Sequence, residues 1–109
     1  MKAVIIESPF KGDYAKNRAY LFMCIRDSIN RGEAPFASHL FYTEVLDDRV
    51  PESRDIGINA GLEWAKHADY IVVYNDLGIS EGMKKGIKFH EEQGKTIVYR
   101  SLDEIWEQL

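Results

Sequence analysis

Short uninterrupted runs of apolar residues alternate along this chain with longer segments in which apolar residues recur every three or four positions. The uninterrupted runs are typical of strands buried on both faces, and the recurring pattern is typical of amphipathic helices. Together they predict strands at residues 3–6, 34–37, 70–74 and 96–99, and helices at residues 14–30, 51–66 and 80–93. Ser101 with Glu104 three residues later is a capping-box signal that predicts a final helix. Residues 39–50 follow neither pattern and are expected to form a long loop.

The order of these elements predicts the fold. Strands that alternate with helices form a parallel sheet whose two faces are covered by the helices. We therefore expect a single α/β domain over residues 1–109, a flavodoxin- or Rossmann-like three-layer α-β-α sandwich with about four parallel strands. Pro35 has no backbone N–H to donate, so the second strand is expected at an edge of the sheet.

Composition narrows the function classes. A net charge of −4 argues against a nucleic-acid partner, because nucleic-acid backbones bind basic surfaces. No apolar run approaches the roughly 20 residues of a membrane span, and the first apolar run is better interpreted as a strand than as a leader. The one cysteine, Cys24, lies in a helical apolar pattern, which favours a buried core residue over a catalytic thiol. A cytoplasmic protein without a membrane partner is expected.

Candidate ligand-binding residues follow from the predicted topology. In a parallel sheet, small ligands bind beyond the carboxyl ends of the strands, where helix N-termini offer N–H groups to an anion or a sugar. Polar side chains are dense in the loops expected to meet there. The candidates are Glu7, Ser8 and Phe10 after the first strand, His39 and Asp48 after the second, and Asp76, Ser80 and Met83 after the third.

Arg54 and two of the three histidines are interpreted as structural. Arg54 either clamps a phosphate or pairs with Asp47 or Asp48, and the ion pair is favoured. His67 and His90 fall at helix-terminal or helix-exposed positions, so no second histidine lies at metal-ligand spacing from the one in the predicted crevice. No metal site and no cofactor is expected.

Four segments carry a family resemblance: SPFKGD at 8–13, APFASHL at 34–40, LDDRVPESR at 46–54 and GISEGM at 78–83. In this order and spacing they resemble the nucleoside 2-deoxyribosyltransferase-like superfamily, above all its small phage or prophage members. The resemblance implies a flavodoxin-like sheet with a pocket for a nucleoside or nucleotide, whose sugar or phosphate end would be lined by Ser8, Pro9, Phe10, Gly78, Ser80 and Gly82. It also implies a homodimer or a larger homo-oligomer, in the host cytoplasm if the gene is viral.

One departure from the family pattern separates the functional hypotheses. The resemblance implies a nucleophilic glutamate one turn into the helix after the last segment, and this chain has Gly86 there. A glycine inside a helix also suggests that a ligand or a neighbouring helix packs closely against it. The first hypothesis is a binder of a nucleotide-derived small molecule without turnover, in a phage setting a sponge for a nucleotide immune signal. The alternative is a deoxyribosyltransferase or nucleotide N-glycosidase with Glu7 or Glu81 as its carboxylate. A third hypothesis is a protein-binding module with a vestigial crevice.

Overall fold

The structure is a computed structural model that describes residues 1–102. Its elements follow one another as β1 (Ala3–Glu7), α1 (Tyr14–Asn30), β2 (Ala34–Phe36), α2 (Ser38–Thr43), α3 (Pro51–Ala65), β3 (Tyr70–Tyr74), α4 (Glu81–Glu92) and β4 (Ile97–Arg100). The predicted strands and the helices at 14–30, 51–66 and 80–93 are confirmed to within a few residues at their ends. The final helix expected after Ser101 lies outside the described residues.

The four strands form one parallel sheet in the order β2-β1-β3-β4. The edge position predicted for the strand with Pro35 is confirmed, because β2 pairs with β1 alone among the described strands. The chain leaves β1 toward one edge of the sheet and then returns to the other side of β1 to form β3. This reversal of direction opens a crevice at the carboxyl ends of β1 and β3, which is where ligands bind in sheets of this kind.

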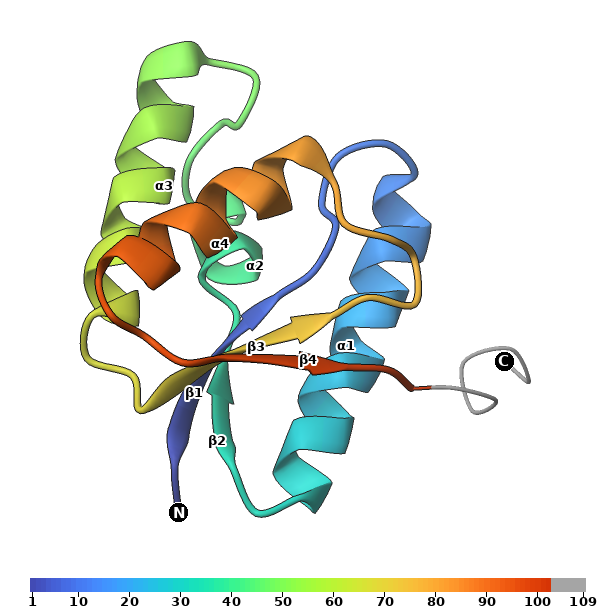
Figure 1. The fold of residues 1–109 in the computed structure, drawn as a ribbon. Coiled ribbons are helices and arrows are strands. Elements are labelled where there is room, and N and C mark those ends of the chain that lie inside the picture. The colour runs from blue at the N-terminus through green and yellow to red at the C-terminus, as the bar shows by residue number, and fades with distance from the viewer. Residues whose placement is uncertain (103–109) are drawn as a thin grey trace.

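Helices cover both faces of the sheet, as Figure 1 shows, and the strands supply a core to each. Successive side chains of a strand point to opposite faces, so Val4 and Ile6 of β1 pack against α1 while Ile5 packs on the face covered by α3 and α4. Cys24 is a core residue, as predicted: it is fully buried between α1 and the sheet, and this burial raises the pKa of its thiol. The three-layer α-β-α fold is confirmed.

The long loop expected at residues 39–50 is wrong in its first part, because Ser38–Thr43 form the short helix α2. The helix has no side-chain N-cap, and its sequence of aromatic and β-branched residues gives little helical signal of its own. Its position depends on α3. A Cβ atom added to Gly61 of α3 would lie 2.5 Å from Oγ of Ser38, so the two helices touch at a point that only glycine allows. That contact is tertiary and leaves no periodicity in the sequence.

A buried ion pair joins the end of α1 to β3 and β4. The carboxylate of Glu33 accepts hydrogen bonds from the Arg100 guanidinium at 2.8 and 3.0 Å and from the Ser28 hydroxyl at 2.8 Å. The Tyr70 hydroxyl donates to the same carboxylate. Arg100 also donates to the Tyr74 hydroxyl, which itself donates to Asp27 at 2.7 Å. These bonds satisfy polar groups that would otherwise be costly to bury.

Candidate functional site

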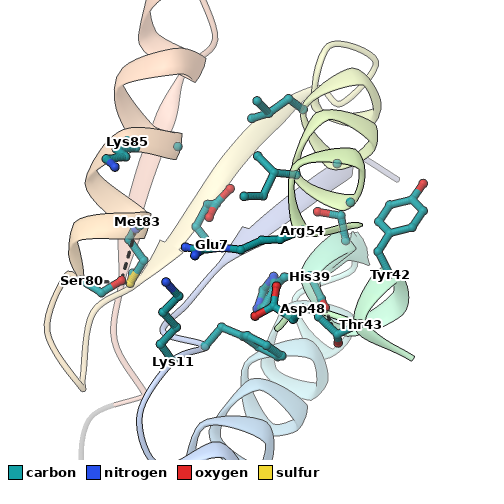
Figure 2. Close-up of a pocket in the computed structure, with 18 of the residues that line it drawn as sticks. Glu7, Lys11, His39, Tyr42, Thr43, Asp48, Arg54, Ser80, Met83 and Lys85 are labelled. Carbon is teal, nitrogen blue, oxygen red and sulfur yellow. Dashed lines mark hydrogen bonds between the residues drawn. The ribbon is translucent and has the colours of Figure 1, made fainter. Parts of the chain in front are cut away.

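A cavity of about 690 Å³ lies at the carboxyl end of the sheet, and segments that follow β1, β2 and β3 line it. The loop after β1, helices α2 and α3, and the first turns of α4 form its walls, and Figure 2 shows side chains from each of them facing it. The predicted site residues that line it are Glu7, Ser8, Phe10, His39, Asp48, Ser80, Glu81, Gly82 and Met83. The predicted residues Pro9, Asp76 and Gly78 border a second, more open hollow, which shares Lys11 and Ser80 with the cavity.

The carboxylate of Glu7 lies against the bare backbone of α4. Glu7 is the last residue of β1 and points to the same face of the sheet as Ile5, toward α4. A Cβ atom added to Gly86 would lie 3.5 Å from both carboxylate oxygens of Glu7. The close neighbour inferred for this glycine from the sequence is present, but it is the Glu7 side chain rather than another helix, and contact with a ligand stays a prediction. The surface that Gly86 leaves uncovered holds a carboxylate of the chain itself.

The side chain of His90 holds the Glu7 carboxylate in place. Its Nε2 atom lies 2.9 Å from Oε1 of Glu7, and its side chain is 1% exposed. The helix-exposed position expected for His90 is wrong, because it lies one turn after Gly86 on the face of α4 that also buries Met83 and Ile87. In the sequence His90 is followed by the polar residues 91–93, so the pattern indicates an exposed position there. Nδ1 of His90 is buried and has no hydrogen-bond partner among residues 1–102.

His39 and Phe10 form a second wall of the cavity. Their rings meet edge to face, with centroids 5.5 Å apart. The Ser8 hydroxyl, itself buried, lies 3.4 Å from Nε2 of His39. Burial lowers the pKa of His39, and the negative charge of Glu7 opposes part of that effect. The imidazole is therefore neutral at neutral pH, with one ring nitrogen able to donate and the other to accept a hydrogen bond.

Basic side chains also reach the cavity from different elements. Lys11 follows β1, Arg54 lies in the first turn of α3, and Lys85 lies on α4. The favoured ion pair of Arg54 with Asp47 or Asp48 is wrong. Asp47 instead accepts from Arg49 at 3.0 Å, two residues along the same loop, and no ion pair joins Arg54 to another residue of the described chain.

The first turn of α4 is closed by its own residues. The Ser80 hydroxyl accepts from the Met83 N–H at 3.2 Å, and the Ser80 N–H donates to the Met83 sulfur at 3.4 Å. Glu81 forms an ion pair with Lys84 at 3.1 Å, and its side chain is 84% exposed. Of the two carboxylates considered as nucleophiles, Glu81 thus faces solvent at the rim while Glu7 is held inside.

Asp76 acts as a tie between segments of the fold. Its carboxylate accepts from the Tyr20 hydroxyl at 2.5 Å, the Ser101 hydroxyl at 2.6 Å and the Leu102 N–H at 2.9 Å. These bonds connect the loop after β3 to α1 and to the chain that leaves β4. Ligand contact by Asp76 remains a prediction.

The sequence pattern predicts the cavity at the correct end of the sheet but identifies only part of its lining. The sequence pattern does not identify the face of α3 that carries Ser53, Gly57 and Ile58, or His90 of α4, as part of the lining. The sequence carries one signal of this contact, because a glycine inside a helix and a glutamate at the end of an apolar strand are both unusual. In the structure these two residues, Gly86 and Glu7, lie against each other. Within residues 1–102, no group of three or more histidine, cysteine or acidic side chains could hold a metal ion. No helix in that part of the chain is long and apolar enough to cross a membrane.

Comparison with known proteins gives a family and a related fold. Residues 2–100 match the model of a family described as a domain of unknown function, DUF7768. No curated protein matches the chain. Among solved structures, a 2-deoxyribosyltransferase from the psychrotolerant bacterium Bacillus psychrosaccharolyticus is similar, with a TM-score of 0.73 and 17% sequence identity. The match covers 91% of this chain and 72% of that one, and at this identity it shows a shared fold.

Proposed function

This chain belongs to the DUF7768 family, and we propose that it binds a nucleoside- or nucleotide-derived small molecule in the cavity beside Glu7. The observation that carries the proposal is the Glu7 carboxylate, held by His90 at the wall of a cavity of about 690 Å³. Cavities of this size enclose ligands of roughly nucleotide size, and a few fixed polar groups among apolar walls orient them.

The cavity walls suit the parts of such a ligand. A fixed carboxylate accepts hydrogen bonds from sugar hydroxyls, and His39 offers a neutral donor and acceptor. Phe10 and Tyr42 line the same cavity and offer aromatic faces for a base. The shared fold with a 2-deoxyribosyltransferase, a protein described as a biocatalyst for the synthesis of nucleosides, supports a ligand of this class.

In the proposed role the ligand is retained rather than turned over, because position 86 carries no side chain. Retention of a nucleotide signal would be sufficient for a sponge, and the resemblance to small phage and prophage proteins supports that setting. An assembly of at least two copies belongs to the proposal. Large exposed apolar side chains, Phe41 of α2 and Ile56 and Trp64 of α3, provide a surface that a second copy would cover.

The test separates binding from turnover in one incubation. Purified protein is mixed with a pool of nucleosides, nucleotides and ADP-ribose derivatives, and free and protein-bound fractions are analysed by mass spectrometry. Bound molecules are released by heat. The expected result is one intact compound enriched in the bound fraction. A bound fraction that matches the pool composition would contradict the proposal and favour a protein-binding module.

Glu7 also favours a second candidate, hydrolysis of an N-glycosidic bond. The two oxygens of its carboxylate lie against Gly86, next to the position where the family resemblance implies a nucleophile. In this reaction a Glu7 oxygen bonds to the anomeric carbon while the carbon–nitrogen bond breaks, and the base leaves with the electron pair and takes a proton from solvent water. A second water molecule then attacks the anomeric carbon and loses a proton to solvent, which frees the sugar and restores the Glu7 carboxylate.

The assay for this candidate is the appearance of free base from nucleosides and nucleoside 5′-monophosphates, followed by chromatography. Glu7→Gln should abolish it, since an amide cannot form the ester. Glu81→Gln is the matched control, because that carboxylate is exposed and paired with Lys84, and it should retain the activity. Absence of free base from the wild-type protein would exclude the second candidate and leave the first intact.

A further inference from the structure

We infer that Lys11 and Arg54 form an anion subsite within the cavity, which takes a phosphate group of the ligand. The inference rests on the proposed function and makes it narrower. A nucleoside phosphate would bind much more tightly than the corresponding neutral nucleoside.

The two cations come from elements far apart in the sequence. Lys11 lies in the loop that follows β1, and Arg54 lies in the first turn of α3. Figure 2 shows both side chains reaching into the cavity, Lys11 from below and Arg54 across from α3. The fold therefore brings two positive charges into one concave space.

Among residues 1–102, Arg54 differs from most other arginines in that no ion pair joins it to a carboxylate. Ion pairs hold Arg18, Arg31, Arg49 and Arg100 to glutamates or aspartates. Asp48 and Asp55 line the same cavity as Arg54, yet no ion pair connects either of them to it in the described part of the chain. Lys11 is likewise without a carboxylate partner among those residues. Of the other two carboxylates that line the cavity, Glu7 is engaged by His90 and Glu81 is paired with Lys84.

Two like charges in a partly enclosed site repel one another more strongly than in water, because the surrounding dielectric is lower. A phosphate removes that repulsion and supplies oxygens for both cations. Arginine holds phosphate through parallel N–H bonds, and lysine adds a mobile point charge. The Glu7 carboxylate would repel the same phosphate. The ligand is therefore expected to place its phosphate at Lys11 and Arg54 and its sugar hydroxyls at Glu7.

The experiment compares matched ligands on matched variants by calorimetry. The probes are the common ribo- and deoxyribonucleosides and their 5′-monophosphates. The variants are Lys11→Gln and Arg54→Gln, and the controls are Lys88→Gln and Arg26→Gln, which remove exposed cations outside the cavity. We expect the wild-type protein to prefer a monophosphate over its nucleoside by at least about tenfold, since hydrogen bonds between charged groups contribute that much. Each cavity variant should lose most of this preference, and each control should keep it.

The outcomes separate this inference from the proposed function. Equal affinity for a nucleoside and its monophosphate would overturn the anion subsite and leave nucleoside binding standing. A phosphate preference that survives both cavity variants would also overturn it, since other groups would then hold the phosphate. Failure of every probe to bind would contradict the proposed function itself, and the subsite would fall with it.

Discussion

Glu33→Gln removes the negative charge from the buried ion pair that joins the end of α1 to β3 and β4. The Glu33 side chain is 7% exposed, and its partner Arg100 is 12% exposed. Glutamine has nearly the same shape, but its single oxygen can accept at only one of the two carboxylate positions, so either Ser28 or Tyr70 loses its acceptor. The substitution therefore removes the charge and one acceptor and leaves the packing almost unchanged.

The magnitude follows from the pKa of the carboxyl group. Hydrogen bonds from Arg100, with further bonds from Tyr70 and Ser28, lower the pKa of Glu33 from 4.5 to about 2, although burial opposes them. At 1.36 kcal/mol per pKa unit, this change corresponds to about 3 kcal/mol of folding free energy at neutral pH. Between pH 4.5 and about 2 the unfolded chain binds more protons than the folded one, so this contribution is complete above pH 4.5 and is lost as the pH falls.

Urea unfolding measured at several pH values between 7 and 3 tests this reasoning. Glu33→Gln should cost about 3 kcal/mol at pH 7, and the difference from the wild-type protein should shrink as the pH falls below 4.5. Glu92→Gln, an exposed glutamate of α4, is the control and should change stability by less than about 0.5 kcal/mol. A cost for Glu33→Gln as small as that of the control, or a cost that does not vary with pH, would refute the argument.

Three further predictions concern the cavity and the core. Gly86→Glu should abolish ligand binding and destabilise the fold, because its side chain would enter the space that the Glu7 carboxylate occupies. Gly86→Ala should be tolerated, because its Cβ atom would lie 3.5 Å from the Glu7 oxygens, an ordinary contact distance. Calorimetry and urea unfolding of both variants measure these effects. Ile71→Ala should cost about 2–5 kcal/mol of unfolding free energy, because Ile71 is fully buried in the central strand β3. His39→Gln should weaken the dependence of folding stability on pH below pH 6.5. Because the pKa of His39 is lowered in the folded state, the folded wild-type protein binds fewer protons there than the unfolded chain and loses stability as the pH falls. Thermal unfolding of both proteins from pH 8 to pH 5 measures the difference.

The sequence predicts the sheet well because its two central strands, β1 and β3, are buried on both faces and the edge strands are at least partly buried. Each strand then appears as an apolar run, and the helices between them keep a regular period. The prediction fails at α2, whose position depends on the contact between Ser38 and Gly61, and at His90, a polar residue on a buried helix face. Both errors come from tertiary contacts that override local patterns.

The same limit applies to the candidate site. Topology alone locates the edge of the sheet at which the cavity lies, so Glu7, Ser8 and His39 are found from the sequence. The meeting of Glu7 with Gly86 and His90 depends on how far α4 extends over β1, a distance that no pattern of residues encodes. The ion pair predicted for Arg54 fails for a similar reason, because Asp47 forms its ion pair with Arg49 of the same loop.

The two sides of the cavity are attached to the protein very differently. The α4 side buries Met83, Ile87 and His90, whereas α2 buries no residue fully and α3 buries only Gly61 and Ala65. Backbone amides of α2 and α3 should therefore open at a lower free energy than those of the sheet, and exchange with deuterium first. A ligand held between the two sides would slow that exchange, and its residence time would be governed by how often the α2–α3 side opens.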